Sequence, residues 1–170
     1  MVIWLTGLSA SGKTTLSKAF EKKFKPTIAN MVLLDGDVIR QLYGNDLGYA
    51  ETDRVVQIKR LQAIASFLEE QSILVVVAAL YANEYLLKYN RSHFKEYFEV
   101  YLKADISILQ TREIKGLYKN ALAGKIENVV GVDIPWNEPC NPDLIFNVSE
   151  GIPPDEMVQI LFNKISKKNG

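Results

Sequence analysis

The sequence is poor in the residues that build disulfides and metal centres, with one cysteine, Cys140, and one histidine, His93. A single cysteine excludes an intramolecular disulfide, and without neighbouring cysteine or histidine residues it forms no metal-binding motif. His93 lies among polar residues and has no catalytic partner near it in sequence, which favours a surface position. We therefore expect Cys140 to be a bystander thiol and His93 a surface residue.

An excess of charge and a long hydrophobic run are also absent. The 20 basic and 20 acidic residues cancel, so no overall field favours nucleic acid or an anionic membrane as the main partner. No apolar stretch approaches the ~18 residues of a membrane span, and no charged leader precedes the first apolar run. The 170 residues, 48% of them hydrophobic, suffice for a core. We expect a cytoplasmic protein with one domain over residues 1–170.

What the sequence does contain is a complete phosphate-binding loop, G-L-S-A-S-G-K-T at residues 7–14. Gly7 and Gly12 let the backbone N–H groups turn inward around a phosphate, because a Cβ would obstruct these conformations. Lys13 is expected to reach the β- and γ-phosphates, and Thr14 to offer its hydroxyl to Mg²⁺. The alternative is a chance glycine-rich turn, which the apolar run before the loop and the helix-like stretch after it disfavour. The residues predicted to bind the phosphates are Gly7, Ser9, Ala10, Ser11, Gly12, Lys13, Thr14 and Thr15.

Strand-like and helix-like segments alternate along the chain, which predicts an α/β P-loop NTPase fold, a parallel sheet with helices on both faces. Strands are expected at residues 2–6, 31–34, 73–80, 98–102 and 144–148. Helices are expected at residues 13–23, 38–43, 51–71, 84–89, 107–113 and 155–167. The valine-rich run at 73–80 is predicted to be the centre of the sheet.

The segment 116–142 carries three glycines and three prolines, an irregular composition rich in hinge residues. We interpret it as too irregular for the core and as part of a mobile lid that covers about residues 112–142.

Two aspartates, Asp35 and Asp37, follow the second predicted strand. At the carboxyl edge of a parallel sheet they would face the phosphates, one beside a Mg²⁺-bound water and the other at an attacking hydroxyl. The alternative is an ordinary turn in which an aspartate caps the next helix. Beside an intact phosphate-binding loop we favour the first interpretation.

Three arginines and a tyrosine come next. Arg40 lies three residues past Asp37 and so on the same helical face, and Arg54 begins the long helix, where its donors could meet a second anionic ligand. Arg60 is interpreted as a surface charge, the commoner fate of an arginine. Tyr49 either stacks on a base or pins its loop to the core.

The sequence resembles the adenylyl-sulfate kinase family over nearly its whole length. The matching blocks, in order and at the family's spacing, are G-L-S-A-S-G-K-T-T at 7–15, L-L-D-G-D-V-I-R at 33–40, D-L-G-Y-A-E-T-D-R at 46–54, K-G-L-Y-K-N-A-L-A-G at 115–124 and G-V-D-I-P-W-N-E-P-C-N-P-D-L at 131–144. The resemblance implies an ATP-dependent kinase that transfers the γ-phosphoryl group to the ribose 3′-hydroxyl of a nucleotide, with Mg²⁺ and a closing lid. It also suggests a homodimer.

The resemblance assigns roles to individual residues. Catalysis falls to Lys13 and to Asp37, which would lie at the accepting hydroxyl, and the metal to Thr14 and Asp35. Arg112 would bind ATP, and with Lys115 would clamp phosphates from the lid side. The residues assigned to the acceptor substrate are Asp37, Arg40, Tyr49, Arg54, Gln57, Tyr81, Asn83, Lys115, Gly116, Leu117 and Val129.

Departures from the family concentrate on the acceptor side. Where the family usually has Ile-Ser-Pro-Tyr-Arg, residues 80–84 are Leu-Tyr-Ala-Asn-Glu, so an arginine has become Glu84. Gln57 replaces an asparagine in the long helix. Val129 replaces a phenylalanine that in the family stacks on the substrate's adenine opposite the aromatic that is here Tyr49. The ATP side is unchanged.

This pattern resembles the cytidine diphosphoramidate kinases of capsular polysaccharide pathways, which phosphorylate the ribose 3′-hydroxyl of cytidine 5′-diphosphoramidate. A pyrimidine is smaller than adenine, and Gln57, Asn83 and Glu84 offer hydrogen-bond acceptors that a terminal amine could use and a sulfate could not. Two alternatives stay open: an ordinary adenylyl-sulfate kinase whose pocket tolerates the changes, and a non-catalytic NTP-binding subunit.

Overall fold

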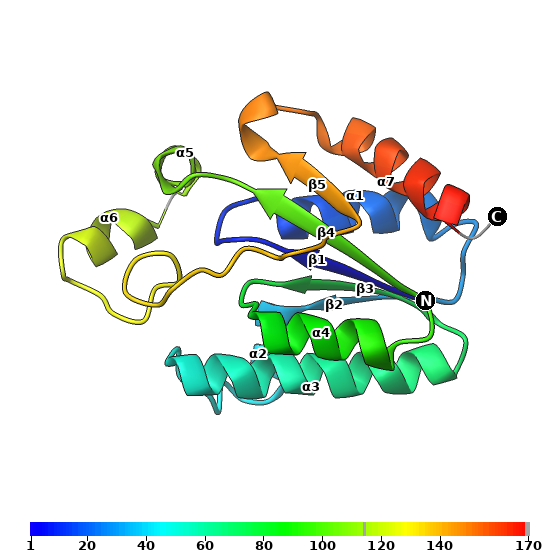
Figure 1. Ribbon diagram of the computed structural model, residues 1–170, viewed down its shortest axis with the longest axis horizontal. Coiled ribbons are helices and arrows are strands. Elements are labelled where there is room, and N and C mark those ends of the chain that lie inside the picture. The colour runs from blue at the N-terminus through cyan, green and yellow to red at the C-terminus, as the bar shows by residue number, and fades with distance from the viewer. Residues whose placement is uncertain (114, 169–170) are drawn as a thin grey trace.

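The computed structural model describes residues 1–113 and 115–168, which form a parallel β-sheet between two layers of helices (Figure 1). This confirms the predicted α/β architecture. The five strands lie in the order β2-β3-β1-β4-β5. Their bounds are β1 (Val2–Thr6), β2 (Met31–Asp35), β3 (Leu74–Ala79), β4 (Tyr97–Lys103) and β5 (Leu144–Asn147).

Helices cover both faces of this sheet, with α1 and α7 on one face and α3 and α4 on the other (Figure 1). The helices are α1 (Lys13–Phe24), α2 (Gly36–Leu42), α3 (Glu51–Glu70), α4 (Glu84–His93), α5 (Ile106–Arg112), α6 (Leu117–Leu122) and α7 (Pro154–Lys168), with a 3₁₀ turn at Val148–Glu150. Among the described residues, none of these helices combines the length and the apolar character that a membrane crossing needs.

Side chains of β1 alternate between two buried clusters. Ile3 and Leu5 pack with residues of α1 and α7, whereas Val2 and Trp4 pack with residues of α3 and α4. Because successive side chains of a strand point to opposite faces, burial on both faces requires an unbroken apolar run. This is why the strands were recognisable in the sequence.

The centre of the sheet is β1, so the prediction that residues 73–80 form it is wrong. β1 pairs with β3 on one side and β4 on the other, and β3 lies between β1 and β2. An apolar run reports that both faces are covered, which is true of every interior strand. It does not report the order of the strands.

The segment after α5 contributes to the core, which corrects the interpretation that it is too irregular to do so. It contains helix α6, whose Tyr118 is fully buried, and Val129, Val130 and Ile134 are also buried in the cluster under α3 and α4. Apolar side chains spaced between glycines and prolines anchor this irregular backbone. Its motion as a lid stays a prediction.

The carboxyl ends of the strands gather the predicted functional segments. The phosphate-binding loop follows β1, Asp35 ends β2, and Tyr81 lies just after β3. Helices α5 and α6 lie beyond the same edge (Figure 1). In open parallel sheets this edge is where ligands bind.

Candidate active site

A cavity of about 940 Å³ opens at the carboxyl edge of the sheet. Its volume lies in the range of about 300–1,000 Å³ that is typical of small-molecule sites. Most residues predicted from the sequence line it, namely Ser9, Ala10, Gly12, Lys13, Thr14, Thr15, Asp35, Asp37, Arg40, Tyr49, Arg54, Gln57, Tyr81, Arg112, Lys115, Leu117 and Val129.

Two residues of the phosphate-binding loop lie behind the cavity wall. A Cβ on Gly7 would come within 2.7 Å of the Leu102 carbonyl oxygen, so this position tolerates only glycine against β4. Ser11 is 2% exposed. Both residues shape the loop, and neither lines the cavity.

Two residues predicted on the acceptor side do not line the cavity either. The side-chain oxygen of Asn83 accepts a hydrogen bond from the Leu86 backbone N–H at 2.9 Å and caps α4. Gly116 precedes α6 with φ of 71°, a left-handed conformation that favours glycine. Glu84, which follows Asn83 in the sequence, pairs with Lys88 at 2.7 Å on the exposed side of α4, outside the cavity.

Lys13 curls over its own loop. Its Nζ donates to the carbonyl oxygens of Gly7 at 2.8 Å and Leu8 at 2.7 Å. Burial lowers the pKa of Lys13 to about 8, although the nearby Asp37 and Asp35 carboxylates act in the opposite direction. An anion placed at this ammonium would stabilise its charged form, so the cradle is built to receive one.

Asp35 caps the next helix, as one interpretation of the sequence predicted, and it also contacts Thr14; its role at a metal stays a prediction. Its Oδ1 accepts from the backbone N–H of Asp37 at 2.9 Å and caps α2, while its Oδ2 accepts from Thr14 Oγ1 at 2.7 Å. Asp37 is exposed and lines the cavity. A carboxylate and a hydroxyl in contact form an oxygen donor set that suits Mg²⁺.

Two arginines flank Tyr49 on the acceptor side. Their guanidinium carbons lie 4.9 Å (Arg40) and 5.6 Å (Arg54) from the centre of its ring. Arg40 donates to the backbone oxygens of Leu47 at 3.0 Å and Gly48 at 2.8 Å, and Arg54 donates through Nε to Tyr49 O at 2.9 Å. Carbonyl groups therefore fix both arginines without neutralising their charge, which favours an anionic ligand.

The two guanidinium groups also affect each other. Burial, and next the charge of Arg40, lower the pKa of Arg54. Tyr49 is 58% exposed, so its ring lies against the arginines at the cavity and not in the core. The ring therefore does not pin its loop to the core, although the Tyr49 backbone oxygen does hold Arg54. Stacking of the ring on a base stays a prediction.

Arg60 is not a free surface charge, so that prediction is wrong. Its side chain is only 15% exposed, pairs with Asp46 at 2.8 Å and lies 3.8 Å over the Tyr43 ring. These contacts fix the loop before α3, and the partner could not be identified from the sequence because the loop itself brings Asp46 to the helix.

Tyr81 fills the floor of the cavity where the related family has a serine. It is 3% exposed, and its hydroxyl donates to Glu51 Oε1 at 2.6 Å. Burial, followed by this hydrogen bond, raises the pKa of Tyr81, so it remains a neutral donor. Across the cavity, Arg54 NH2 donates to Asn128 O at 2.7 Å beside Val129.

Several lining residues were missed from the sequence. The cavity is also bounded by Gly36, Ile58, Leu61, Ala78, Ala79, Leu80, Glu113, Asn120, Ile126, Glu127, Asn128 and Val130. Ile58 follows Arg54 by four residues and Leu61 follows Gln57 by four, a helical spacing that was a usable signal. Asn120 and Asn128 reach the cavity only because the segment after α5 folds back over it.

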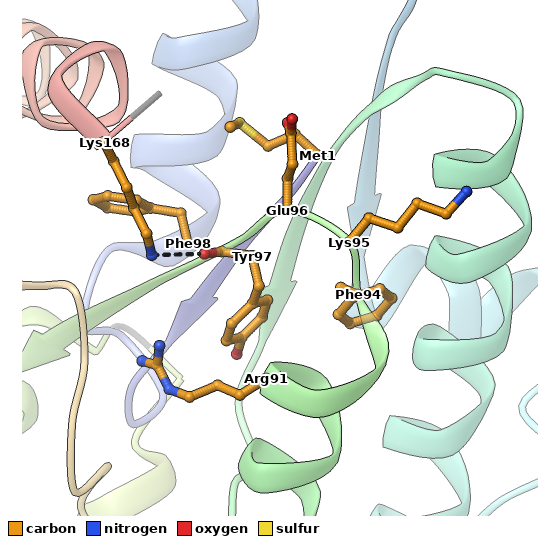
Figure 2. A pocket seen from close by; sticks show the side chains of 8 residues that line it. All are labelled: Met1, Arg91, Phe94, Lys95, Glu96, Tyr97, Phe98 and Lys168. Carbon is orange, nitrogen blue, oxygen red and sulfur yellow. Dashed lines mark hydrogen bonds between the residues drawn. The ribbon is translucent and has the colours of Figure 1, made fainter. Parts of the chain in front are cut away.

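A second cavity, of about 350 Å³, lies at the opposite edge of the sheet (Figure 2). It is lined by Met1, Arg91, Phe94, Lys95, Glu96, Tyr97, Phe98 and Lys168. Lys168 Nζ donates to Tyr97 O at 3.0 Å and pairs with Asp143, and Arg91 also pairs with Asp143. These charges are engaged within the protein, so the larger cavity is the candidate active site.

Comparison with known proteins gives consistent matches. The model of the adenylylsulphate kinase family matches residues 1–147. The chain is 37% identical over 165 residues to cytidine diphosphoramidate kinase of Campylobacter jejuni, covering 97% of this chain and 96% of that protein. It is 35% identical over 144 residues to adenylyl-sulfate kinase of Rippkaea orientalis, covering 85% and 80%. The structure of Mycobacterium tuberculosis APS kinase in complex with AMPPNP and APS aligns with a TM-score of 0.86 at 31% identity, covering 97% and 96%.

Proposed function

Because the chain belongs to the adenylyl-sulfate kinase family and is a nucleotide 3′-kinase, we propose that its acceptor is cytidine 5′-diphosphoramidate, used in capsular polysaccharide modification. The family implies ATP as the phosphoryl donor. The proposal is supported by a relative named for this activity that matches over nearly the whole of both chains.

One observation carries the choice of acceptor: the cavity wall that bears an aromatic ring in the family bears Val129 here. Val129 is 5% exposed and its neighbour Asn128 is held by Arg54, so the wall is an aliphatic surface in a fixed place. The loss of one stacking face removes about 1–3 kcal/mol of base binding. Tyr81, where the family has a serine, is a larger side chain and so narrows the acceptor side of the cavity. A smaller pyrimidine suits both changes.

The head group is expected at Arg40 and Arg54. Their carbonyl-bound guanidinium groups suit the phosphates of a diphosphoramidate. Of the three acceptors predicted for its amine, only Gln57 lines the cavity, and its Nε2 donates to Gly36 O at 3.0 Å. Asn83 is not available there, and the loss of the family's arginine at position 84 is the remaining argument against a sulfate.

On the donor side, the chain's own residues orient and neutralise the phosphates. Lys13 and the loop N–H groups balance charge on the transferred γ-phosphoryl group, and Arg112, at the end of α5, and Lys115, after it, face that group. Asp37 accepts the hydrogen bond of the 3′-hydroxyl and positions it in line. Thr14 and Asp35 would hold Mg²⁺, which when bound supplies further charge neutralisation at the phosphates.

Release of ADP, coupled to NADH oxidation, tests this proposal with two acceptors side by side. We expect a higher kcat/KM for cytidine 5′-diphosphoramidate than for adenylyl sulfate, and a product phosphorylated on the 3′-hydroxyl by ³¹P spectroscopy. A preference for adenylyl sulfate would overturn the choice of acceptor. Failure to release ADP with either nucleotide would favour a non-catalytic NTP-binding subunit.

Adenylyl-sulfate kinase is the second candidate. The observation in its favour is the fold match to a structure solved with APS, together with the retained Arg40 and Arg54.

With either acceptor, we also propose that the chain acts as one domain over residues 1–170 and as a homodimer. Light scattering coupled to gel filtration tests the dimer, and a monomeric mass would contradict it.

A further inference from the structure

The cavity wall that carries Val129 is a tight turn, residues 128–134, closed by the side chain of Asp133. Oδ1 of Asp133 accepts from the Val129 backbone N–H at 2.6 Å, and Oδ2 accepts from that of Asn128. The Val129 carbonyl accepts from the N–H groups of Val132 at 3.0 Å and Ile134 at 3.2 Å. The turn is therefore closed by its own hydrogen bonds.

Within this turn Asn128 has an uncommon backbone. Its φ of 65° lies in the left-handed region, which side chains other than glycine adopt at a cost, asparagine less than most. The Asp133 carboxylate accepts from the N–H of Asn128 and from the next N–H, which offsets this cost. These bonds also lower the pKa of Asp133, the bond from Val129 most, so the carboxylate stays charged.

Asn128 also contacts the acceptor side of the site through its backbone carbonyl. Asn128 O accepts from Arg54 NH2 at 2.7 Å, and Arg54 Nε donates to Tyr49 O at 2.9 Å. A single arginine thus joins the Tyr49 side of the acceptor pocket to the Val129 side. Asp133 does not itself line the cavity, so any effect on a ligand passes through Arg54 or through Val129, whose backbone N–H it binds.

The back of the turn rests on fixed neighbours. A Cβ on Gly131 would come within 3.2 Å of both Ile106 Cδ1 and Leu8 Cδ2, and the φ of Gly131 is 91°. This close packing seats the turn against α5 and the phosphate-binding loop. At Gly131 the contact with that loop is to the Leu8 side chain, and among the described residues the turn makes no hydrogen bond to Lys13 or Thr14, so we expect its main influence on the acceptor side.

We propose that Asp133 is a positioning residue for the nucleotide acceptor, holding the 128–134 turn so that Arg54, Tyr49 and Val129 keep their places. The inference rests on the proposed function only in requiring a nucleotide acceptor on this side of the cavity. It does not depend on which base that nucleotide carries.

The test is Asp133→Asn, which keeps the shape but replaces one accepting oxygen with a donor. Loss of a charge-assisted hydrogen bond should raise KM for the acceptor about tenfold. KM for ATP should not change. The matched control is Glu138→Gln, which removes an exposed carboxylate of the same segment, paired with Lys103 at 2.9 Å, and should leave both constants unchanged.

A double-mutant cycle separates positioning from general destabilisation. In an Arg54→Met background, Asp133→Asn should raise the acceptor KM by less than it does in the wild type, because the part of its effect that passes through Arg54 is gone. An equal increase in both backgrounds, or an equal increase in KM for ATP, would overturn the proposal. The proposed function fails separately, by a wild-type preference for adenylyl sulfate, and the cycle is measured with whichever nucleotide the wild type prefers.

Discussion

The two sides of the cavity are built in different ways. The donor side comes from one short motif and the strand end beside it: Lys13 bonds to its own loop, and Thr14 bonds to Asp35. The acceptor side is assembled from segments far apart in the chain, since Arg54 joins the backbone of Tyr49 to that of Asn128. The donor side is unchanged from the family pattern, and the departures fall on the acceptor side.

This difference explains how such a fold can change its substrate and keep its chemistry. Charge neutralisation at the phosphates depends on a loop that tolerates little variation, because a Cβ on Gly7 would meet backbone atoms of β4. The acceptor wall is a turn with its own internal bonds, so we expect its cavity-facing side chain at Val129 to vary without moving Lys13. Substitutions on the two sides should therefore have separable kinetic effects.

The largest effect is expected for Lys13→Ala. Removing the only side-chain cation placed within the phosphate loop should lower kcat by roughly 1,000-fold or more with any acceptor. Steady-state ADP release measures this, and Lys18→Ala, an exposed lysine on the same helix, is the control. Substantial turnover by the Lys13 variant would break the assignment of the donor side.

Asp37→Asn should be the next most damaging substitution. Loss of the carboxylate at the 3′-hydroxyl should lower kcat by about 100- to 1,000-fold. ATP affinity, measured by calorimetry, should be preserved, because Asp37 makes its contribution on the acceptor side of the transferred group. A parallel loss of ATP affinity would instead place Asp37 at the metal or the phosphates.

The same contrast governs what was predictable from the sequence. Local signals sufficed for the strands and for placing the phosphate-binding loop at the cavity: burial on both faces produces unbroken apolar runs, and a glycine-rich loop between strand and helix has one main use. The helix cap by Asn83 was also a local feature, yet the resemblance to the family led us to assign Asn83 to the substrate pocket. There the capping chemistry of asparagine was the stronger signal.

Long-range features were not predictable. The order of strands, the pairing of Arg60 with Asp46, and the burial of Tyr118, whose hydroxyl donates to Ser9 O at 3.1 Å, all depend on how distant segments meet. Composition suggested that residues 116–142 lie outside the core, because glycines and prolines obscure the few apolar side chains that anchor it. The acceptor wall lies in this segment, so its contacts were the least accessible to sequence reasoning.

Val129→Phe should sharpen the comparison by changing only the acceptor side. Since the turn fixes the Val129 backbone, a larger ring should project toward the cavity and restore a stacking face. The ratio of kcat/KM for adenylyl sulfate to that for cytidine 5′-diphosphoramidate should rise by about tenfold or more. Leu122→Phe, at a position 62% exposed in the same segment, is the control. An unchanged ratio with unchanged thermal stability would show that the base does not contact this wall.

The smallest effect is a pH dependence confined to the donor side. Burial lowers the pKa of Lys13 to about 8, so its ammonium loses its proton as the pH rises through that value. ATP binds the charged form, so its Kd should be flat below about pH 8 and rise by up to about tenfold per pH unit above it. Calorimetry in buffers of different ionisation enthalpy should detect proton uptake on ATP binding near that pH. The acceptor side has arginines in place of a lysine, and guanidinium groups as a class stay charged over this range, so the acceptor Kd should remain constant. If the two dissociation constants rise together, the two sides of the cavity are not electrostatically independent.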